Sequence, residues 1–557
     1  MPASGGSLRR TGLVAVLVVI LGACTGDPDP AVGPVATAGG ATPGAETTAP
    51  TGGSPTPTES PNFEPDAVVL DVAVTEPSTL DPMRIQDPAS VLVARQLYEG
   101  LTAWDPDAEE VIPAAAESWE VSNGGRTFTF ELRSGMTFHD GRSVRAEDFL
   151  FAFNRIAKKK SGSELAYTLD RVEGFEEVNQ FGDSNKLSGL RAPNDTTLKI
   201  TLSEPFREFP AVLTHPGLVP LRKDSVEDTE TFLSEPAGNG AFQIVEPWTP
   251  GESVTMKSFD DFFVSQDLDG IRFNPFPDAA ASWLQFVAGD FDVAEVPAGQ
   301  IEAAAEAFGD RGYKPFLAGY YYGLNVKSKA LRKRRGREAI SRAIDREYIA
   351  TNIYKETMAA PRGIVPRGMP GFEDDICARL CEHSPAAARS MVRRLPAKRR
   401  EVRLEYTVGP PHTQVARAVK QDLEDVGFNV KVKGYAFDRY LRRLRAGDQE
   451  MYRLGWIAEY PVADVFLSSL FAADSPDNHS GFSSKKVDKL LSKAHKESSE
   501  AARVELYRRA ERKILAKVPI VPIGDFVTHW AAQENVENIQ FDVMGGFDAV
   551  TVRLLEE

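Results

Sequence analysis

The stretch SGMTFHDGRSVRAEDFLFAFNRI, residues Ser134–Ile156, is the most informative part of the chain for the fold. Asp140-Gly141 predicts a turn, and Glu147–Ala157 places apolar residues on one face of a helix. Arg126–Leu132, just before it, alternates polar and apolar residues as a half-buried strand does. His139 lies where this strand meets the turn, and we expect it to be structural rather than catalytic.

Strands and helices alternate along the rest of the chain without a fixed repeat. The β-branched run Val68–Pro77 and the segment Leu198–Leu202 predict strands. Apolar periodicity predicts helices over Arg337–Ile353, Thr413–Val426 and Ala501–Leu515. This mixture predicts an α/β architecture with several lobes.

The composition limits the class of function. The 557 residues are 42% hydrophobic, and the net charge of −16 argues against a nucleic-acid partner. The sequence contains no Gly-x-Ser-x-Gly elbow, phosphate-binding loop, His-Glu-x-x-His motif or dinucleotide fingerprint. We therefore expect a binding protein, not an enzyme, with no cofactor and no metal site.

The N-terminus resembles a bacterial lipoprotein signal. Arg9 and Arg10 precede the apolar run Leu13–Leu21, and Leu21-Gly22-Ala23-Cys24 closes it. The resemblance implies that residues 1–23 are a signal peptide, and that Cys24 carries the lipid that anchors the chain to the cell membrane, outside the cytoplasm. The alternative is an ordinary secretory signal with an incidental cysteine. No later run of apolar residues is long enough to span a bilayer.

Residues 24–66 are rich in Pro, Gly, Ala, Thr and Ser and contain almost no large apolar side chain. Such a segment cannot offset its ordering entropy by burial, so we expect a disordered tether. About 40 residues of flexible chain have a root-mean-square reach of roughly 35 Å.

Cys377 and Cys381 are the other two cysteines. In an exported protein this spacing favours a disulfide. A metal site that includes His383, or two free thiols, are the alternatives.

Seven sequence blocks, in the same order, resemble the large extracellular solute-binding proteins of peptide ABC importers. Each block is moderately specific, and their common order makes the resemblance strong. They are LDPMRIQDPASVLVARQLYEGL (80–101), IPAAAESWEVSNGGRTFTFELR (112–133), the opening stretch (134–156), ISRAIDREYIATNIY (340–354), VPRGMPGF (365–372), VARAVKQDLEDVGFNVKV (415–432) and RLGWIAEYP (453–461).

The resemblance implies a periplasmic-binding-protein-like fold of the cluster C type, with two lobes, a hinge and an additional domain. Domain I would combine residues 67–105, 217–295 and 520–557, the additional domain II would span 106–216, and domain III would span 296–519. It also implies ABC permease and ATPase subunits as partners, and we expect a monomer.

The resemblance further implies that a small peptide lies extended between two strand segments. One matches Gly455-Trp456-Ile457, and the other falls near Ile85-Gln86-Asp87-Pro88, where Pro88 lacks an N–H. Trp456 would wall a side-chain pocket, and simple core packing is the alternative. Tyr321, from the run Tyr320-Tyr321-Tyr322, would face the ligand, although alternation in a strand allows only one face of the run to do so.

Charged groups are expected at the two ends of the ligand. Glu459 matches the family's aspartate for the ligand's ammonium, with an arm one methylene longer, and Val462-Ala463-Asp464 replaces the usual Asp-Pro. Arg453 matches an arginine that meets the carboxylate of short ligands, and the alternative is a surface or interdomain salt bridge. His412 falls near a position that approaches the same end.

The sequence leaves three functions open. A peptide receptor of an ABC importer is the first. The second is the same role for a nickel complex, haem or an oligosaccharide, favoured by the altered region after Glu459. The third is an extracellular enzyme or scaffold on the same fold.

Overall fold

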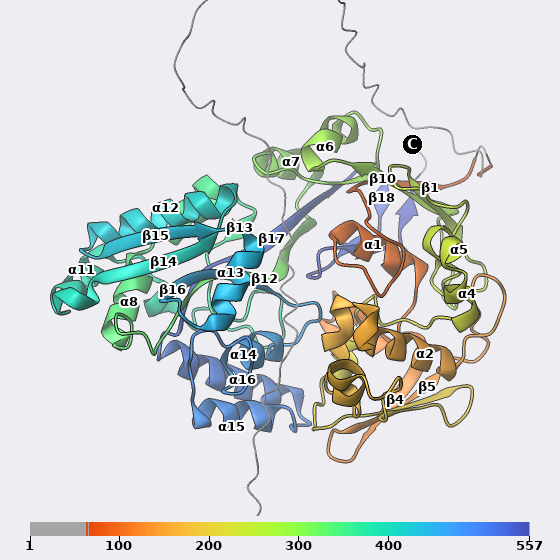
Figure 1. Cartoon of the computed structure of the whole chain (residues 1–557). Helices are drawn as coiled ribbons and strands as arrows, with labels where there is room; N and C mark the ends of the chain where they lie inside the picture. Colours follow the sequence, from red (N-terminus) through yellow and green to blue (C-terminus); the bar gives the residue numbers. More distant parts are fainter. Residues whose placement is uncertain (1–62, 65, 556–557) are drawn as a thin grey trace, which may run out of the picture.

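The computed structural model describes residues 63, 64 and 66–555, which form two lobes joined by long strands (Figure 1). The predicted signal peptide, Cys24 and nearly all of the predicted tether lie outside the described residues. Within the described part of the chain, no helix is long and apolar enough to cross a membrane.

One mixed sheet of 11 strands runs through both lobes. Its order begins in one lobe and ends in the other, and β13 (Met358–Ala359) joins it by pairing with β17. The strands in order are β15 (Asn429–Tyr435), β14 (Glu401–Thr407), β16 (Met451–Ile457), β12 (Gly312–Leu324), β17 (Ile520–Ala532), β11 (Val293–Glu295), β1 (Val69–Thr75), β10 (Gly270–Phe276), β9 (Val254–Ser258) and β8 (Phe242–Ile244).

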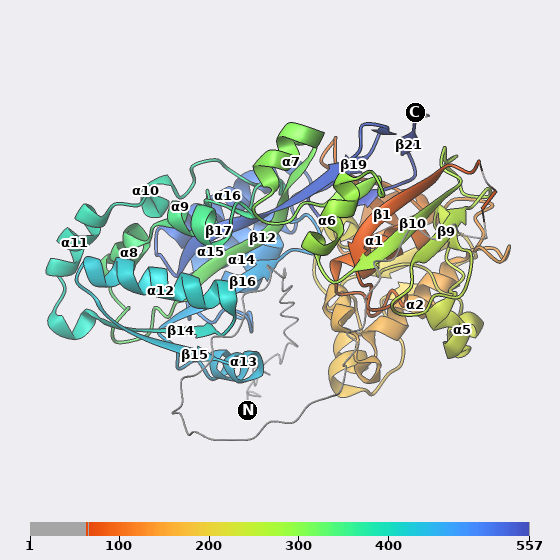
Figure 2. The same ribbon diagram turned by 90° about the horizontal axis from the view of Figure 1, so that it is seen from above.

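In the lobe built on β12, β14, β15 and β16, helices cover both faces of the sheet (Figures 1 and 2). Successive side chains of a strand point to opposite faces, so Tyr320 and Tyr322 enter one core while Leu317 and Tyr321 enter the other. The first core is closed by α8 (Arg334–Ala343), α11 (Pro385–Arg393) and α12 (Pro410–Asp425), and the second by α13 (Phe437–Ala446), α14 (Asp464–Phe471), α15 (Lys485–Ala494) and α16 (Glu500–Leu515).

The other lobe combines β1 and β10 with a separate four-stranded sheet, in the order β4-β5-β7-β6. The larger hydrophobic core of this lobe extends from Leu70 through Phe128 and Phe153 to Phe273, and a smaller one packs Ala73 and Phe276 against Trp283 and Phe286 of α6 (Ala279–Val287). The elements around it include β4 (Ala116–Ser122), β5 (Thr127–Leu132), β6 (Leu190–Arg191), β7 (Thr197–Thr201), α1 (Pro88–Leu97) and α2 (Ala146–Ala157).

The remaining elements are short and connect these layers. The strands form the pairs β2–β3, β18–β21 and β19–β20. Their bounds, with those of the remaining helices, are β2 (Thr102–Asp105), β3 (Glu110–Pro113), β18 (Val536–Glu537), β21 (Arg553–Leu554), β19 (Gln540–Phe541), β20 (Phe547–Asp548), α3 (Phe209–Val212), α4 (Lys223–Glu227), α5 (Thr229–Ser234), α6 (Ala279–Val287), α7 (Ile301–Phe308), α9 (Arg346–Tyr348), α10 (Ala378–Cys381), the 3-10 helices η1 (Lys159–Ser161), η2 (Glu164–Leu169) and η5 (Ala397–Arg399), and the π-helices η3 (Glu176–Phe181) and η4 (Ile349–Ile353).

The opening stretch folds as its pattern predicts, and His139 is structural. The His139 ring accepts a hydrogen bond from Gly238 N–H at Nδ1 (3.1 Å), and its Nε2 lies 3.0 Å from the Gly240 carbonyl oxygen. Because Nδ1 accepts, Nε2 carries the proton and donates. Burial lowers the pKa of His139 to about 4, so the ring is neutral at pH 7.

The helix predicted over Arg337–Ile353 is interrupted. α8 ends at Ala343, where Ile344 is extended, and Asp345 caps the next turn by accepting from Tyr348 N–H. Apolar periodicity alone does not reveal this break, because Asp345 supplies a new N-cap inside an otherwise helical pattern.

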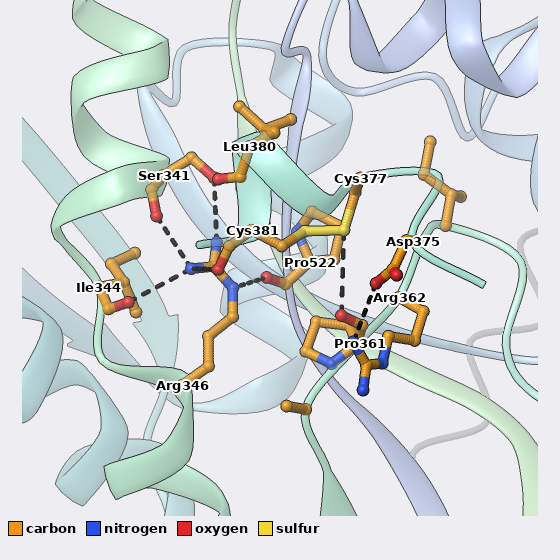
Figure 3. The surroundings of a disulfide bond; sticks show 12 residues. Ser341, Ile344, Arg346, Pro361, Arg362, Asp375, Cys377, Leu380, Cys381 and Pro522 are labelled. Atoms are coloured by element: carbon orange, nitrogen blue, oxygen red, sulfur yellow. Dashed lines mark hydrogen bonds and ion pairs between the residues drawn. A yellow bond between two sulfur atoms is a disulfide. The ribbon is translucent and has the colours of Figure 1, made fainter. Parts of the chain in front are cut away.

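Cys377 and Cys381 form a disulfide across the one-turn helix α10 (Figure 3). The carbonyl of Cys381 accepts from Arg346 Nη1 at 2.9 Å, and that guanidinium also donates to Pro522 O of β17 at 2.7 Å. The bonded turn therefore fastens α10 to α9 and to the central sheet.

We predict that the double substitution Cys377→Ser/Cys381→Ser lowers the free energy of unfolding by about 2 kcal/mol, because so short a loop removes little entropy from the unfolded chain. Urea unfolding of both proteins, with and without reductant, measures it. A wild-type stability that is unchanged by reductant, together with two titratable thiols at these positions, would contradict the assigned bond.

Candidate functional site

The end of β16 has a free backbone edge. β16 pairs with β12 along its whole length, but with β14 only at Met451 and Tyr452. The pairing with β14 has ended by Arg453, whose carbonyl oxygen instead accepts a hydrogen bond from the Tyr440 hydroxyl. Within the described chain, Gly455, Trp456 and Ile457 have a strand partner on one side only, so an extended chain can pair with the other side.

Arg453 is buried without a carboxylate partner. Arg453 is 5% exposed, and its guanidinium lies 4.5 Å from the centre of the Tyr320 ring. Among the described residues, no Asp or Glu forms an ion pair with Arg453, and the buried hydroxyl of Tyr354 has no protein partner. A buried unpaired charge is costly, so this cluster is suited to an anionic group.

His412 borders the same cluster from α12. Its ring lies 5.7 Å from that of Tyr320, and its Nδ1 has no protein partner. Burial, and then the charge of Arg453, lower the pKa of His412 to about 3. The ring is neutral at pH 7, so Arg453 supplies the positive charge of this cluster.

Tyr321 and Trp456 lie on the opposite face of the strands. Tyr321 is 6% exposed and packs in the core beneath α14 and α16, so alternation gives Tyr320, not Tyr321, to the Arg453 cluster. Trp456 is half-buried against the same core, and its indole N–H has no protein partner.

Glu459 follows β16 and contacts the other lobe. Its Oε2 accepts a hydrogen bond from the Tyr167 hydroxyl and lies 3.4 Å from His215 Nε2. Because His215 Nδ1 accepts from Gly217 N–H at 2.9 Å, Nε2 carries the proton in the neutral ring. Within the described residues Oε1 of Glu459 has no hydrogen-bond donor, so one oxygen stays available for a cation.

Asp87 serves as the N-cap of α1. Its Oδ1 accepts from Ser90 N–H at 2.7 Å, and its Oδ2 accepts from the Ser78 hydroxyl. Pro88 is the first residue of the helix, where an N–H is not needed. The segment Ile85–Pro88, which we expected to be a strand beside the ligand, is therefore a loop that starts a helix.

A hollow of about 590 Å³ lies beside this loop, lined in part by Ser78, Asp81, Arg155 and Phe232. Arg155 forms two hydrogen bonds with Asp81, at 2.7 and 2.6 Å, so the charges there are already paired. None of the predicted site residues lines this hollow.

Sequence reasoning missed Tyr167 and His215, which share Glu459 Oε2. They lie 292 and 244 positions before Glu459 and carry no local motif. Among the described residues, no group of three or more His, Cys, Asp or Glu side chains could hold a metal ion.

Comparisons with known proteins show the family and the fold. The family model of bacterial extracellular solute-binding proteins, family 5, matches residues 110–478. The oligopeptide-binding protein OppA of Bacillus subtilis is 25% identical over 491 residues, covering 84% of this chain and 88% of its own. The probable deoxycholate-binding periplasmic protein YgiS of Escherichia coli is 27% identical over 471 residues, covering 81% and 86%.

Among solved structures, the murein tripeptide-binding protein MppA in its unliganded open form aligns with a TM-score of 0.76 at 23% identity, covering 88% of this chain and 99% of MppA. The fold is that of the two-lobe solute-binding proteins. The chain belongs to the bacterial extracellular solute-binding proteins, family 5.

Proposed function

We propose that this chain is the substrate-binding receptor of an ABC importer and captures short peptides between its two lobes. The observation that supports it best is the free edge of β16, with the unpaired Arg453 at one end and Glu459 beyond the other. A receptor for many peptides needs backbone pairing and end-charge recognition, since only these groups are common to all its ligands.

Each site residue then has a role. The backbone of Gly455, Trp456 and Ile457 pairs with the peptide, and Trp456 also borders a side-chain pocket. Glu459 accepts the peptide's ammonium through Oε1, and Arg453 meets its carboxylate. His412 is a neutral neighbour of that carboxylate, whereas Asp87 and Tyr321 support the strand and helix around the site.

The spacing of the two charges limits the length of the peptide. Arg453 and Glu459 are six residues apart on one chain, which spans at most about 20 Å at roughly 3.3 Å per residue. At the same rise of roughly 3.3 Å per residue, an extended peptide that contacts both Arg453 and Glu459 has about six residues or fewer.

We predict that Glu459→Gln weakens binding of a short peptide with a free amine by about 2–5 kcal/mol, because it leaves a desolvated ammonium unpaired. Calorimetric titration of both proteins with trialanine and with N-acetyl-trialanine measures it.

The acetylated peptide is the control, since it carries no ammonium and should bind both proteins equally. Equal affinity of the wild type and the variant for trialanine would contradict the role of Glu459. Arg453→Met, titrated with trialanine and its C-terminal amide, tests the carboxylate end in the same way.

We also propose the domain division 67–105 with 217–295 and 520–557, 106–216, and 296–519. Domains I and II share one hydrophobic core, which supports their movement as one body. Closure would then rotate domain III against both of them, about the strands that join the lobes.

We propose that the protein is a monomeric extracytoplasmic lipoprotein that works with ABC permease and ATPase subunits. The signal-like segment before Cys24 and the Pro/Gly/Thr-rich run after it support the tether. A tether raises the effective concentration of the receptor at a fixed permease.

We predict that metabolic labelling with palmitate marks the wild type and not Cys24→Ser, and that this variant leaves the membrane fraction. The measurement is fractionation followed by immunoblotting. Equal labelling of both proteins would show that Cys24 is not the lipid attachment site.

A further inference from the structure

Asp464 lies five residues beyond Glu459, at the first position of α14, and its carboxylate joins three elements. It is 3% exposed. Arg171 Nη2 donates to Oδ2 at 2.9 Å, His495 Nε2 lies 2.7 Å from Oδ1, and the Ser468 hydroxyl also donates to Oδ1. Arg171 comes from the other lobe, while His495 and Ser468 come from the lobe of Asp464.

The partners of Asp464 stabilise its carboxylate as an anion. Burial by itself would raise the pKa of Asp464, but His495 and Arg171 together lower it to about 2. The guanidinium of Arg171 also stacks 4.1 Å from the centre of the Phe206 ring, against whose face the His495 ring stands edge-on. A buried carboxylate held by a guanidinium, an imidazole ring and a hydroxyl has little freedom to move.

The loop that connects Glu459 to Asp464 is also fixed by apolar contact. Val462 is 2% exposed and belongs to the core of the other lobe, with Tyr460 packed against that core. The chain turns between these residues through a hydrogen bond from Val462 N–H to Tyr460 O at 2.9 Å. Val462-Ala463-Asp464, the departure from the family pattern, thus supplies one apolar and one ionic anchor.

Two contacts run side by side across the lobes. Glu459 accepts a hydrogen bond from Tyr167, and Asp464 accepts one from Arg171. The six-residue segment 459–464 and the five-residue segment 167–171 are therefore joined at both of their ends. A segment fixed at both ends holds its side chains in one geometry, which is what recognition of a ligand group requires.

We propose that Asp464 is a positioning residue for amine recognition: with Arg171 and His495 it holds the 459–464 loop so that Glu459 and Tyr167 meet, leaving Glu459 Oε1 for the ligand's ammonium. This inference rests on the proposed role of Glu459.

Glu208 offers a matched control within the chain. Its carboxylate also links the two lobes, through Arg503 Nε at 3.1 Å and the Tyr507 hydroxyl. Among the described residues, it forms no hydrogen bond or ion pair with the 459–464 loop or with the segment from Tyr167 to Arg171, although Asp464 and His495 lie close enough to influence its pKa. We expect Glu208→Gln to weaken lobe contact while the hydrogen bonds of Glu459 and Asp464 remain.

The test is calorimetric titration of the wild type, Asp464→Asn, Glu208→Gln and Glu459→Gln with alanine peptides of two to five residues and their N-acetyl forms. We expect Asp464→Asn to lower the preference for the free amine about tenfold and to leave the affinity for acetylated peptide unchanged. Glu208→Gln should keep the preference. In the Glu459→Gln background, adding Asp464→Asn should not change the preference for the free amine any further.

The outcomes separate this inference from the proposed function. Loss of preference in Glu459→Gln but not in Asp464→Asn would overturn the positioning role alone. An unchanged preference in Glu459→Gln, or failure of the wild type to bind any of the peptides, would overturn both. If Asp464→Asn and Glu208→Gln each weaken the binding of free and acetylated peptides equally, Asp464 only joins the lobes, and the positioning role is wrong. If Asp464→Asn does not fold, Arg171→Gln tests the same ion pair from its other partner, whose side chain is 29% exposed and so easier to replace.

Discussion

Two strands of 13 residues each, β12 and β17, pair antiparallel in the middle of the sheet, and the placement of every site residue depends on that pairing. β17 connects outward to β11 and β1 in one lobe, and β12 connects to β16 in the other. Because side chains alternate on a strand, the register of β12 decides that Tyr320 borders Arg453 while Tyr321 packs in the opposite core.

The site keeps polar groups whose partners a ligand can supply. Among the described residues, the buried Arg453 has no carboxylate partner, and the backbone of Gly455 to Ile457 lacks a second strand. Such groups reduce the stability of the empty protein and become favourable when a ligand completes them. Glu459 differs, because Tyr167 and His215 already hold one of its oxygens. The longer arm of a glutamate, compared with an aspartate, suits a carboxylate that reaches across to the other lobe.

The sequence predicted the family, the fold class and the larger elements, because these depend on periodic patterns and ordered motifs. The pairing of Cys377 with Cys381 also followed from local spacing. The break after Ala343 and the N-cap role of Asp87 did not, because a single capping residue overrides the surrounding pattern. Tyr167, His215 and Arg171 reach the site from hundreds of residues away, so only the packing of the two lobes brings them to Glu459 and Asp464.

The central claim is that the free edge of β16 and its two flanking charges hold a short peptide. Native mass spectrometry of the protein purified from its own host, followed by sequencing of the released ligand, tests this claim most directly. The account predicts a set of short peptides with free amino termini and varied side chains. A single non-peptide species, such as a metal complex, haem, a bile acid or an oligosaccharide, would contradict it.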